Sequence, residues 1–159
     1  MDTIQINFDS LRKASWSDQE TENVKLVIDF IYHLMNKHDF DYVAKKFGNQ
    51  SYVQHNRGIP DGMSALIEYV KNFAGTYPEY AYDVKHIFAD GDFVIFHSHA
   101  TTKAQHRGND QKGLNIIDTW EIKNGEIVTH WDALQPLDGF MRFYNLLVGG
   151  KIKNANGVF

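Results

Sequence analysis

The hydrophobic periodicity of the chain changes near residue 80, and this change constrains the fold more than any other feature. Before it, apolar residues recur at helical spacing; after it, apolar and polar residues alternate as they do in strands. A block of helices followed by a block of long strands predicts an α+β fold rather than alternating βαβ units. We therefore expect three N-terminal helices packed on one face of a mostly antiparallel sheet.

The helical part carries clear start and stop signals. Ser17 and Glu20 form a capping-box pattern before the first apolar stripe, and polar residues and glycines bound the next two stripes. A short strand is expected in SYVQHN, at residues 51–56. The expected helices are residues 19–37, the segment from Asp39 to Gly48, and the segment from Asp61 to Gly75.

Turn-forming sequences divide the second part into four strands, which are followed by a tail. ADGD, HRGNDQKG and KNGE separate the strands, and their Asp-Gly and Asn-Gly pairs are hairpin signals. We expect one domain over residues 1–159, with a core at about 17–136 and a C-terminal tail at 137–159. The expected strands are residues 80–88, 92–104, 113–122 and 126–135.

Composition excludes several classes of protein. A net charge of −4 over 159 residues provides no basic surface for nucleic acid. Since the chain has no cysteine, disulfides, thiolate catalysis and zinc–sulfur sites are excluded. The first residues do not resemble a signal peptide, and no stretch approaches the ~20 apolar residues of a membrane helix. We expect a cytoplasmic protein that binds neither nucleic acid nor membrane.

The hairpin at KNGE decides which side chains share a face with Asp132. A regular two-residue turn pairs Lys123 with Glu126 and points Asp118 away from Asp132. A three-residue loop with Gly125 in a left-handed bulge places Asp118 opposite His130 instead. We prefer the bulged loop, because it gathers Asp118, His130 and Asp132 on one wall of the sheet.

Strand 92–104 has apolar residues on both faces. Phe93, Ile95, His97 and His99 alternate with Val94, Phe96, Ser98 and Ala100. One face can pack on the helices, and the other needs a different cover. We expect a homodimer, joined in part through a face that carries Val94, Phe96 and Ile117.

Four segments resemble the SnoaL-like proteins of the nuclear transport factor 2-like superfamily, in particular the polyketide-cyclase and aldol-condensation branch. Together they span roughly residues 22–136, and the paired QHN and HWDxxQ segments are the most specific. The resemblance implies a cone-shaped, curved antiparallel sheet wrapped around the helices, with an apolar pocket at its open end. The four segments are FIYHLMNKHDFDYVAKKFG, SYVQHNRGIPDG, ADGDFVIFHSHA and IIDTWEIKNGEIVTHWDALQP.

The resemblance also implies roles for particular residues. In the cyclases an aspartate two positions after a histidine on the last strand acts as acid and base, which assigns that role here to Asp132 beside His130. His97 and Asp118 are expected to complete the catalytic group, without a metal or cofactor. Expected substrate-binding residues, taken from the matching segments and the same wall, are Tyr52, His55, Asn56, Trp120 and Gln135.

The chemistry of such a site follows from its residue types. A carboxylate in an apolar pocket has its charged form disfavoured, so its pKa rises toward the range useful for a base at neutral pH. The enolate that forms when a proton leaves a carbon beside a carbonyl needs a hydrogen-bond donor. We expect a small, mostly apolar carbonyl compound as the ligand, and an aldol-type cyclisation, isomerisation or dehydration as the reaction.

Two other functions remain open at this point. The same fold can serve as a non-catalytic binding domain, since fold does not fix function. His97 and His99, two apart on a strand, could also ligate a metal ion. Against a cupin-type metal site, Lys103 and Ala104 stand where the next acidic ligand would be expected.

Overall fold

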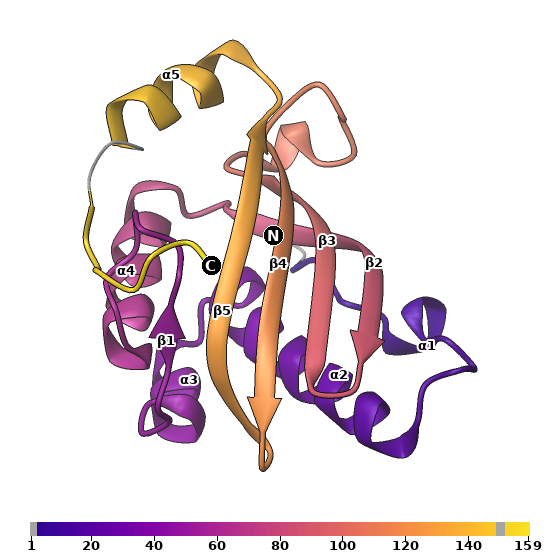
Figure 1. Cartoon of the computed structure of the whole chain (residues 1–159). Helices are drawn as coiled ribbons and strands as arrows, with labels where there is room; N and C mark the ends of the chain where they lie inside the picture. Colours follow the sequence, from indigo (N-terminus) through magenta and orange to yellow (C-terminus); the bar gives the residue numbers. More distant parts are fainter. Residues whose placement is uncertain (1–2, 149–151) are drawn as a thin grey trace.

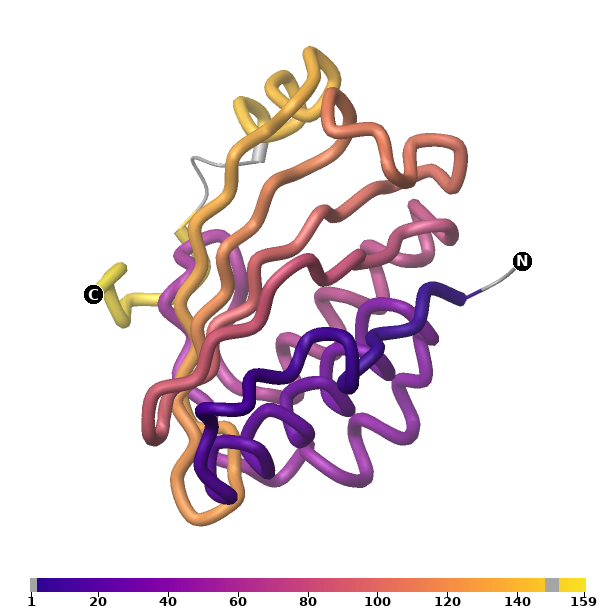
Figure 2. The backbone as a smooth tube through the Cα atoms, turned by 90° about the vertical axis from the view of Figure 1, so that its right-hand side faces the viewer, coloured from indigo at the N-terminus to yellow at the C-terminus, as the bar shows by residue number. Residues whose placement is uncertain are grey.

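A computed structural model describes residues 3–148 and 152–159 of the chain. Five strands form one curled sheet in the order β1-β5-β4-β3-β2, and helices α2, α3 and α4 gather on its inner face (Figures 1 and 2). This is the α+β arrangement predicted from the change in periodicity. The strands are β1 (Val53–Gln54), β2 (Ala81–Asp90), β3 (Phe93–Thr101), β4 (Leu114–Lys123) and β5 (Glu126–Pro136).

The helices begin close to the predicted positions. The capping box at Ser17 and Glu20 is present at the start of α2, and the Asp39 side chain accepts the Tyr42 N–H at the start of α3. Asp61 does not cap α4; its carboxylate accepts the backbone N–H of Gln54 instead. The helices are α1 (Phe8–Leu11), α2 (Asp18–Ile31), a π-helical turn (Tyr32–Asn36), α3 (Phe40–Phe47), α4 (Met63–Thr76), a 3₁₀ turn (Ala104–His106) and α5 (Gly139–Val148).

The sheet is antiparallel from β2 to β5, and short β1 pairs in parallel with β5 at its edge. This pairing places Gln54 directly beside His130. Since β1 leads into the turn at residues 55–62, that turn is held next to the inner face of β5. The edge strand therefore adds the polar Gln54 side chain beside His130 on this face.

The hydrophobic core lies between the inner face of the sheet and the helices. Side chains from α2, α3 and α4 pack against alternate residues of β3 and β4. Trp120 and Phe96 meet edge to face with ring centroids 5.2 Å apart. Among the described residues, no helix is long and apolar enough to cross a membrane.

The KNGE hairpin differs from our prediction in its turn but places the same residues on one wall. Lys123 pairs with Glu126, and both Asn124 and Gly125 have positive φ, as a two-residue type I′ turn requires. The bulge lies at Val128 instead, because Glu121 pairs with Thr129 while Ile122 pairs with Ile127. This extra residue restores the phase of β5 and sets Asp118 opposite Asp132, not opposite His130.

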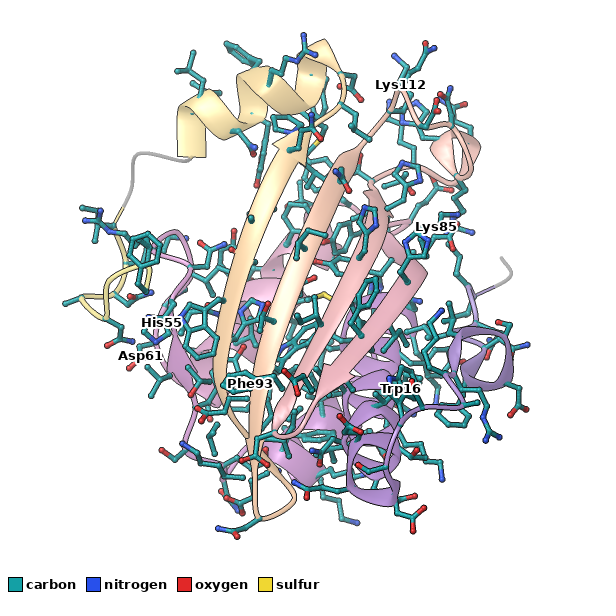
Figure 3. The ribbon with its side chains drawn as sticks, turned by 45° about the vertical axis from the view of Figure 1, so that its right-hand side comes forward. Trp16, His55, Asp61, Lys85, Phe93 and Lys112 are labelled. Atoms are coloured by element: carbon teal, nitrogen blue, oxygen red, sulfur yellow. The ribbon has the colours of Figure 1, made fainter. Side chains whose placement is uncertain are left out.

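The predicted dimer face does not exist as a single surface. Val94 and Phe96 are fully buried on the inner face, whereas Ile117 is 38% exposed on the outer one. Phe93 likewise points outward from β3 (Figure 3). The strand has apolar residues on both faces, so its sequence alone did not show which set meets the helices.

The described parts of the C-terminal tail, residues 137–148 and 152–159, lie at one end and along one edge of the sheet. Helix α5 lies beyond the ends of β4 and β5, and residues 152–159 run along the edge beside β1 (Figure 1). The Asn154 amide donates to the carbonyls of Asn56 and Ile59, each at 2.8 Å. The tail thus fixes the turn that follows β1.

Candidate functional site

A cavity of about 570 Å³ lies between the inner face of β4 and β5 and the helices. Apolar and aromatic side chains form most of its wall, and a few polar groups converge on it, as is usual for a small-molecule site. Its principal lining residues are Phe30, Tyr52, His55, Asn56, Arg57, Leu66, Tyr69, Val70, Phe73, Tyr80, Tyr82, Asp118, Trp120, His130, Asp132, Leu134, Met141, Tyr144 and Lys153.

Asp118 and His130 form a buried pair in the wall of this cavity. His130 Nε2 lies 2.9 Å from Asp118 Oδ1, and the two side chains are only 7% and 4% exposed. The other carboxyl oxygen, Asp118 Oδ2, is buried with no hydrogen-bond partner. An unpaired buried carboxyl oxygen is costly, and here it belongs to a residue that lines the cavity.

Gln54 fixes the tautomer of His130. Gln54 Oε1 accepts the backbone N–H of Asn56 at 2.8 Å, so the amide oxygen, not the nitrogen, must occupy that position. The same oxygen lies 2.9 Å from His130 Nδ1, which must therefore carry a proton and donate it.

The proton on His130 Nδ1 determines how many protons the buried Asp118–His130 pair holds. With Nδ1 protonated, Nε2 and Asp118 Oδ1 can approach to 2.9 Å only if one proton lies between them. The pair is then either an imidazolium with a carboxylate or a neutral imidazole with a carboxylic acid. In both forms it holds one proton that can be donated.

The pKa values of both members are raised. Burial raises the pKa of Asp118, and the hydrogen bond and charge of His130 offset this only in part. For His130, burial acts downward, but the hydrogen bond and charge of Asp118, with the charge of Asp132, outweigh it and raise the pKa. The imidazole is also near-parallel to two aromatic rings, with centroids 5.3 Å from Trp120 and 6.3 Å from Tyr52. Such π-faces favour its cationic form.

Asp132 lies nearer to solvent than this pair. The Asp132 side chain is half-buried, whereas Asp118 and His130 are buried deeper in the cavity wall. The Asn56 side-chain amide is 2.8 and 2.7 Å from its two oxygens. Asn56 is held in turn by the Gly58 N–H, which donates to Asn56 Oδ1. This network fixes the direction of the Asp132 carboxylate.

His97 and Gln135 do not belong to the site. Because Phe96 pairs with Asp118, His97 faces the other side of the sheet, where its Nε2 lies 2.6 Å from Asn115 Oδ1. Asn115 donates to Gln135 on the same outer face. The remaining expected residues all line the cavity: Tyr52, His55, Asn56, Asp118, Trp120, His130 and Asp132.

His97 and His99, considered above as a metal-ligating pair, instead form hydrogen-bond contacts with other groups on the outer face. His97 Nδ1 lies 3.0 Å from His86 Nδ1, and His99 Nε2 lies 2.6 Å from the Lys112 carbonyl.

Three residues in the cavity wall have side chains of the types that ligate metal ions. One ligand atom from each of Asp118, His130 and Asp132 lies within 4.8 Å of the other two.

Several functional candidates were missed from the sequence. Gln54 stands in the quoted QHN segment, yet only its pairing beside His130 reveals its role. Burial raises the pKa of Tyr52, Tyr80 and Tyr82 above the usual range, so these phenols stay protonated. The Tyr52 hydroxyl lies near Gln54 and Trp120 but has no partner with hydrogen-bond geometry.

Comparison with solved structures shows relatives with this fold. A candidate polyketide cyclase from Bacillus cereus ATCC 10987 matches 87% of this chain and 89% of its own, at 19% identity and a TM-score of 0.63. A candidate SnoaL-like polyketide cyclase from Jannaschia sp. CCS1 matches 90% and 99%, at 12% identity and 0.62. An NTF2-like protein of unknown function from Cytophaga hutchinsonii matches 72% and 90%, at 18% and 0.54. These identities support a shared fold alone.

Sequence comparison identifies the family. No curated protein matches the chain. The family model for the SnoaL-like domain matches residues 27–130, which include β1, Asp118 and His130 but end before Asp132 and the tail. The chain therefore belongs to the SnoaL-like domain family of the nuclear transport factor 2-like superfamily.

Proposed function

We propose that this protein is a cofactor-independent enzyme that transfers protons beside a substrate carbonyl, in an aldol-type cyclisation, isomerisation or dehydration. One observation carries the proposal: a fixed carboxylate, Asp132, and a one-proton pair, Asp118–His130, face the same largely apolar cavity. Acid/base chemistry at carbon needs a base and a proton donor that act on one ligand. Both groups are present on adjacent strands.

Asp132 is assigned as the base. Its carboxylate takes a proton from the carbon next to the carbonyl, and the electrons of that C–H bond form the enolate. The proton of the Asp118–His130 pair leaves the link between Nε2 and Oδ1 and passes to the enolate oxygen. In a cyclisation, the enolate carbon then bonds to a second carbonyl carbon of the same molecule. As the first carbonyl re-forms, its oxygen returns the proton to the Asp118–His130 pair, and the second oxygen takes the proton held by Asp132. General acid–base catalysis of this kind accelerates a reaction about 10²–10⁴-fold.

The rest of the cavity suits a small, mostly apolar carbonyl compound. Phe30, Leu66, Val70 and Phe73 provide apolar contact. Tyr69 lies in the same wall, and burial, with the charge of Asp132, raises its pKa, so its hydroxyl is a donor at neutral pH. Polar contacts in such a pocket orient the ligand, while apolar contacts supply most of the affinity.

Carbon-acid exchange tests the proposal. A panel of apolar ketones is incubated in D₂O, and deuterium uptake beside the carbonyl is measured by NMR above the rate in buffer. We expect Asp132→Asn to reduce enzyme-dependent uptake by about 10²-fold or more. Asp90→Asn, at the exposed β2–β3 hairpin, is the matched control and should retain it. Full uptake by a folded Asp132→Asn variant would remove Asp132 as the base and favour a binding domain.

A divalent metal site is the second candidate, supported by the Asp118, His130 and Asp132 trio. His130 has the orientation of many metal-ligating histidines, since Nδ1–H donates to an oxygen and leaves Nε2 for the ligand position. In the structure, however, Nε2 is bonded to Asp118. Calorimetric titration with Zn²⁺ and Mn²⁺ distinguishes the candidates, because a resident metal site requires tight binding that Asp118→Asn abolishes.

A further inference from the structure

We infer that the substrate carries a carboxylate, which binds Arg57 and Lys153 at the mouth of the cavity while the carbonyl-bearing part lies against Asp132. This inference rests on the proposed function in taking the cavity as the substrate site. It adds the chemical class of the ligand: an apolar carbonyl compound with an anionic end.

Arg57 and Lys153 are the two formally cationic residues among the described residues that line the cavity. Both side chains are exposed, so they lie where the cavity meets solvent. Within the described parts of the chain, neither side chain forms an ion pair with a carboxylate. Two cations that line a cavity without acidic partners are free to bind an anionic group on a ligand.

The two cations come from distant parts of the sequence and are joined by the backbone. The Lys153 N–H donates to the Arg57 carbonyl at 2.7 Å. Asn154 and Asn156 then bond the tail to the residues around Arg57, including Asn56 and Asp61. Figure 3 shows this tail beside the turn that carries His55 and Asp61. The tail therefore adds Lys153 to a wall that already contains Arg57.

The Lys153 side chain is directed along the cavity wall. Its Nζ lies 4.5 Å from the centre of the Tyr69 ring, and Tyr69 itself lines the cavity. This cation–π contact holds the ammonium group against the wall while leaving its N–H donors available.

The distribution of charge in the cavity gives the ligand a direction. Asp118 and His130 are buried, Asp132 is half-buried, and the cations are exposed. An anionic group is repelled by Asp132 and attracted by Arg57 and Lys153, so it remains at the mouth. The carbonyl-bearing end of the ligand therefore enters the cavity first. Lys153 lies beyond residues 27–130, the part that matches the family model.

Two fluorescent probes with the same aromatic body test the inference. The anionic probe is 8-anilinonaphthalene-1-sulfonate, and the neutral one is N-phenyl-1-naphthylamine, which lacks the sulfonate. Their dissociation constants are measured for the full chain at low and high salt, and competition shows whether they share one site. Arg57→Gln with Lys153→Gln is compared with Lys45→Gln with Lys71→Gln, which removes two exposed lysines outside the cavity.

We expect the Arg57/Lys153 double variant to weaken binding of the anionic probe about tenfold, and to change binding of the neutral probe less than twofold. The Lys45/Lys71 control should change neither. High salt should remove the preference of the unmodified protein for the anionic probe. Equal weakening of both probes would show that the cations only support the wall, and no weakening would show that they do not contact the anion. Either result, or failure of the probes to compete, overturns the inference. Because binding is measured without turnover, this outcome is independent of whether Asp132 is a base.

Discussion

Asp118 and Asp132 lie directly opposite each other on β4 and β5, and both line the same cavity. His130 lies two residues before Asp132 on β5, but its hydrogen bond is to Asp118 on β4 and not to Asp132. The two carboxyl groups thus have different surroundings: one is buried against an imidazole, and the other is half-buried against the Asn56 amide. Different environments are what separate acid and base roles in a pair of like groups.

The Asp118–His130 pair makes the free energy of unfolding depend on pH. Because the pKa of His130 is raised above its unfolded value of 6.5, its stabilising contribution is full below 6.5 and is lost as pH rises through the folded pKa. The pKa of Asp118 is raised above its unfolded value of 3.8, so this group too lowers the free energy of unfolding as the pH rises above 3.8. We expect the free energy of unfolding in urea to fall as the pH rises above 6.5.

Asp118→Asn should flatten this dependence, because it removes the charge that raises the pKa of His130. Asp90→Asn, exposed at the hairpin, should keep it. A dependence of equal slope in Asp118→Asn and the unmodified protein would show that the pair does not cause it.

Gln54 should be important for stability as well as for the site. Its side chain is fully buried, and Oε1 accepts from both His130 and Asn56. Gln54→Met leaves two donors without an acceptor, at a cost of about 1–3 kcal/mol for each buried donor. The exposed Gln19→Met should change the free energy of unfolding by less than about 0.5 kcal/mol. Urea unfolding measures both, and equal effects would contradict the network.

Gly125 should determine how well the β4–β5 hairpin forms. Its φ is +75°, and a Cβ there would meet no atom within 4 Å, so only backbone strain opposes a side chain. Gly125→Ala should therefore cost about 1–2 kcal/mol, whereas Gly139→Ala, which has equal space but is helical, should be tolerated. Thermal unfolding compares the two, and equal losses would mean that the turn imposes no special strain.

The homodimer remains a prediction, but its surface must differ from the one expected. Phe88, Phe93 and Ile117 are 52%, 40% and 38% exposed, and a second copy packed on this outer face would cover them. Sedimentation at micromolar concentration should give twice the chain mass. Phe93→Glu with Ile117→Glu should give the single mass and an unchanged circular-dichroism spectrum. A monomeric unmodified protein would rule out this interface at that concentration.

The sequence predicted the order of elements well because each depends on local periodicity and turn signals. It predicted that Asp118, His130 and Asp132 share a wall, but through the wrong turn, since the bulge at Val128 lies in a stretch without glycine or proline. His97 was misplaced because both faces of β3 are apolar, and only pairing with β4 decides which faces inward. Lys153 could not be assigned, because its place depends on how the tail docks.

The protonation of His130 tests the central claim most directly. Nitrogen-15 NMR of the imidazole reports each ring nitrogen separately. We predict that Nδ1 stays protonated at every pH at which the protein is folded, because it donates to Gln54, and that any titration is confined to the Nε2–Asp118 link. Asp118→Asn should shift the Nε2 signal and leave Nδ1 protonated. A neutral imidazole with its proton on Nε2 and a bare Nδ1 would contradict the account, because the pair would then hold its proton in a different arrangement from the one that the Gln54 hydrogen bond requires.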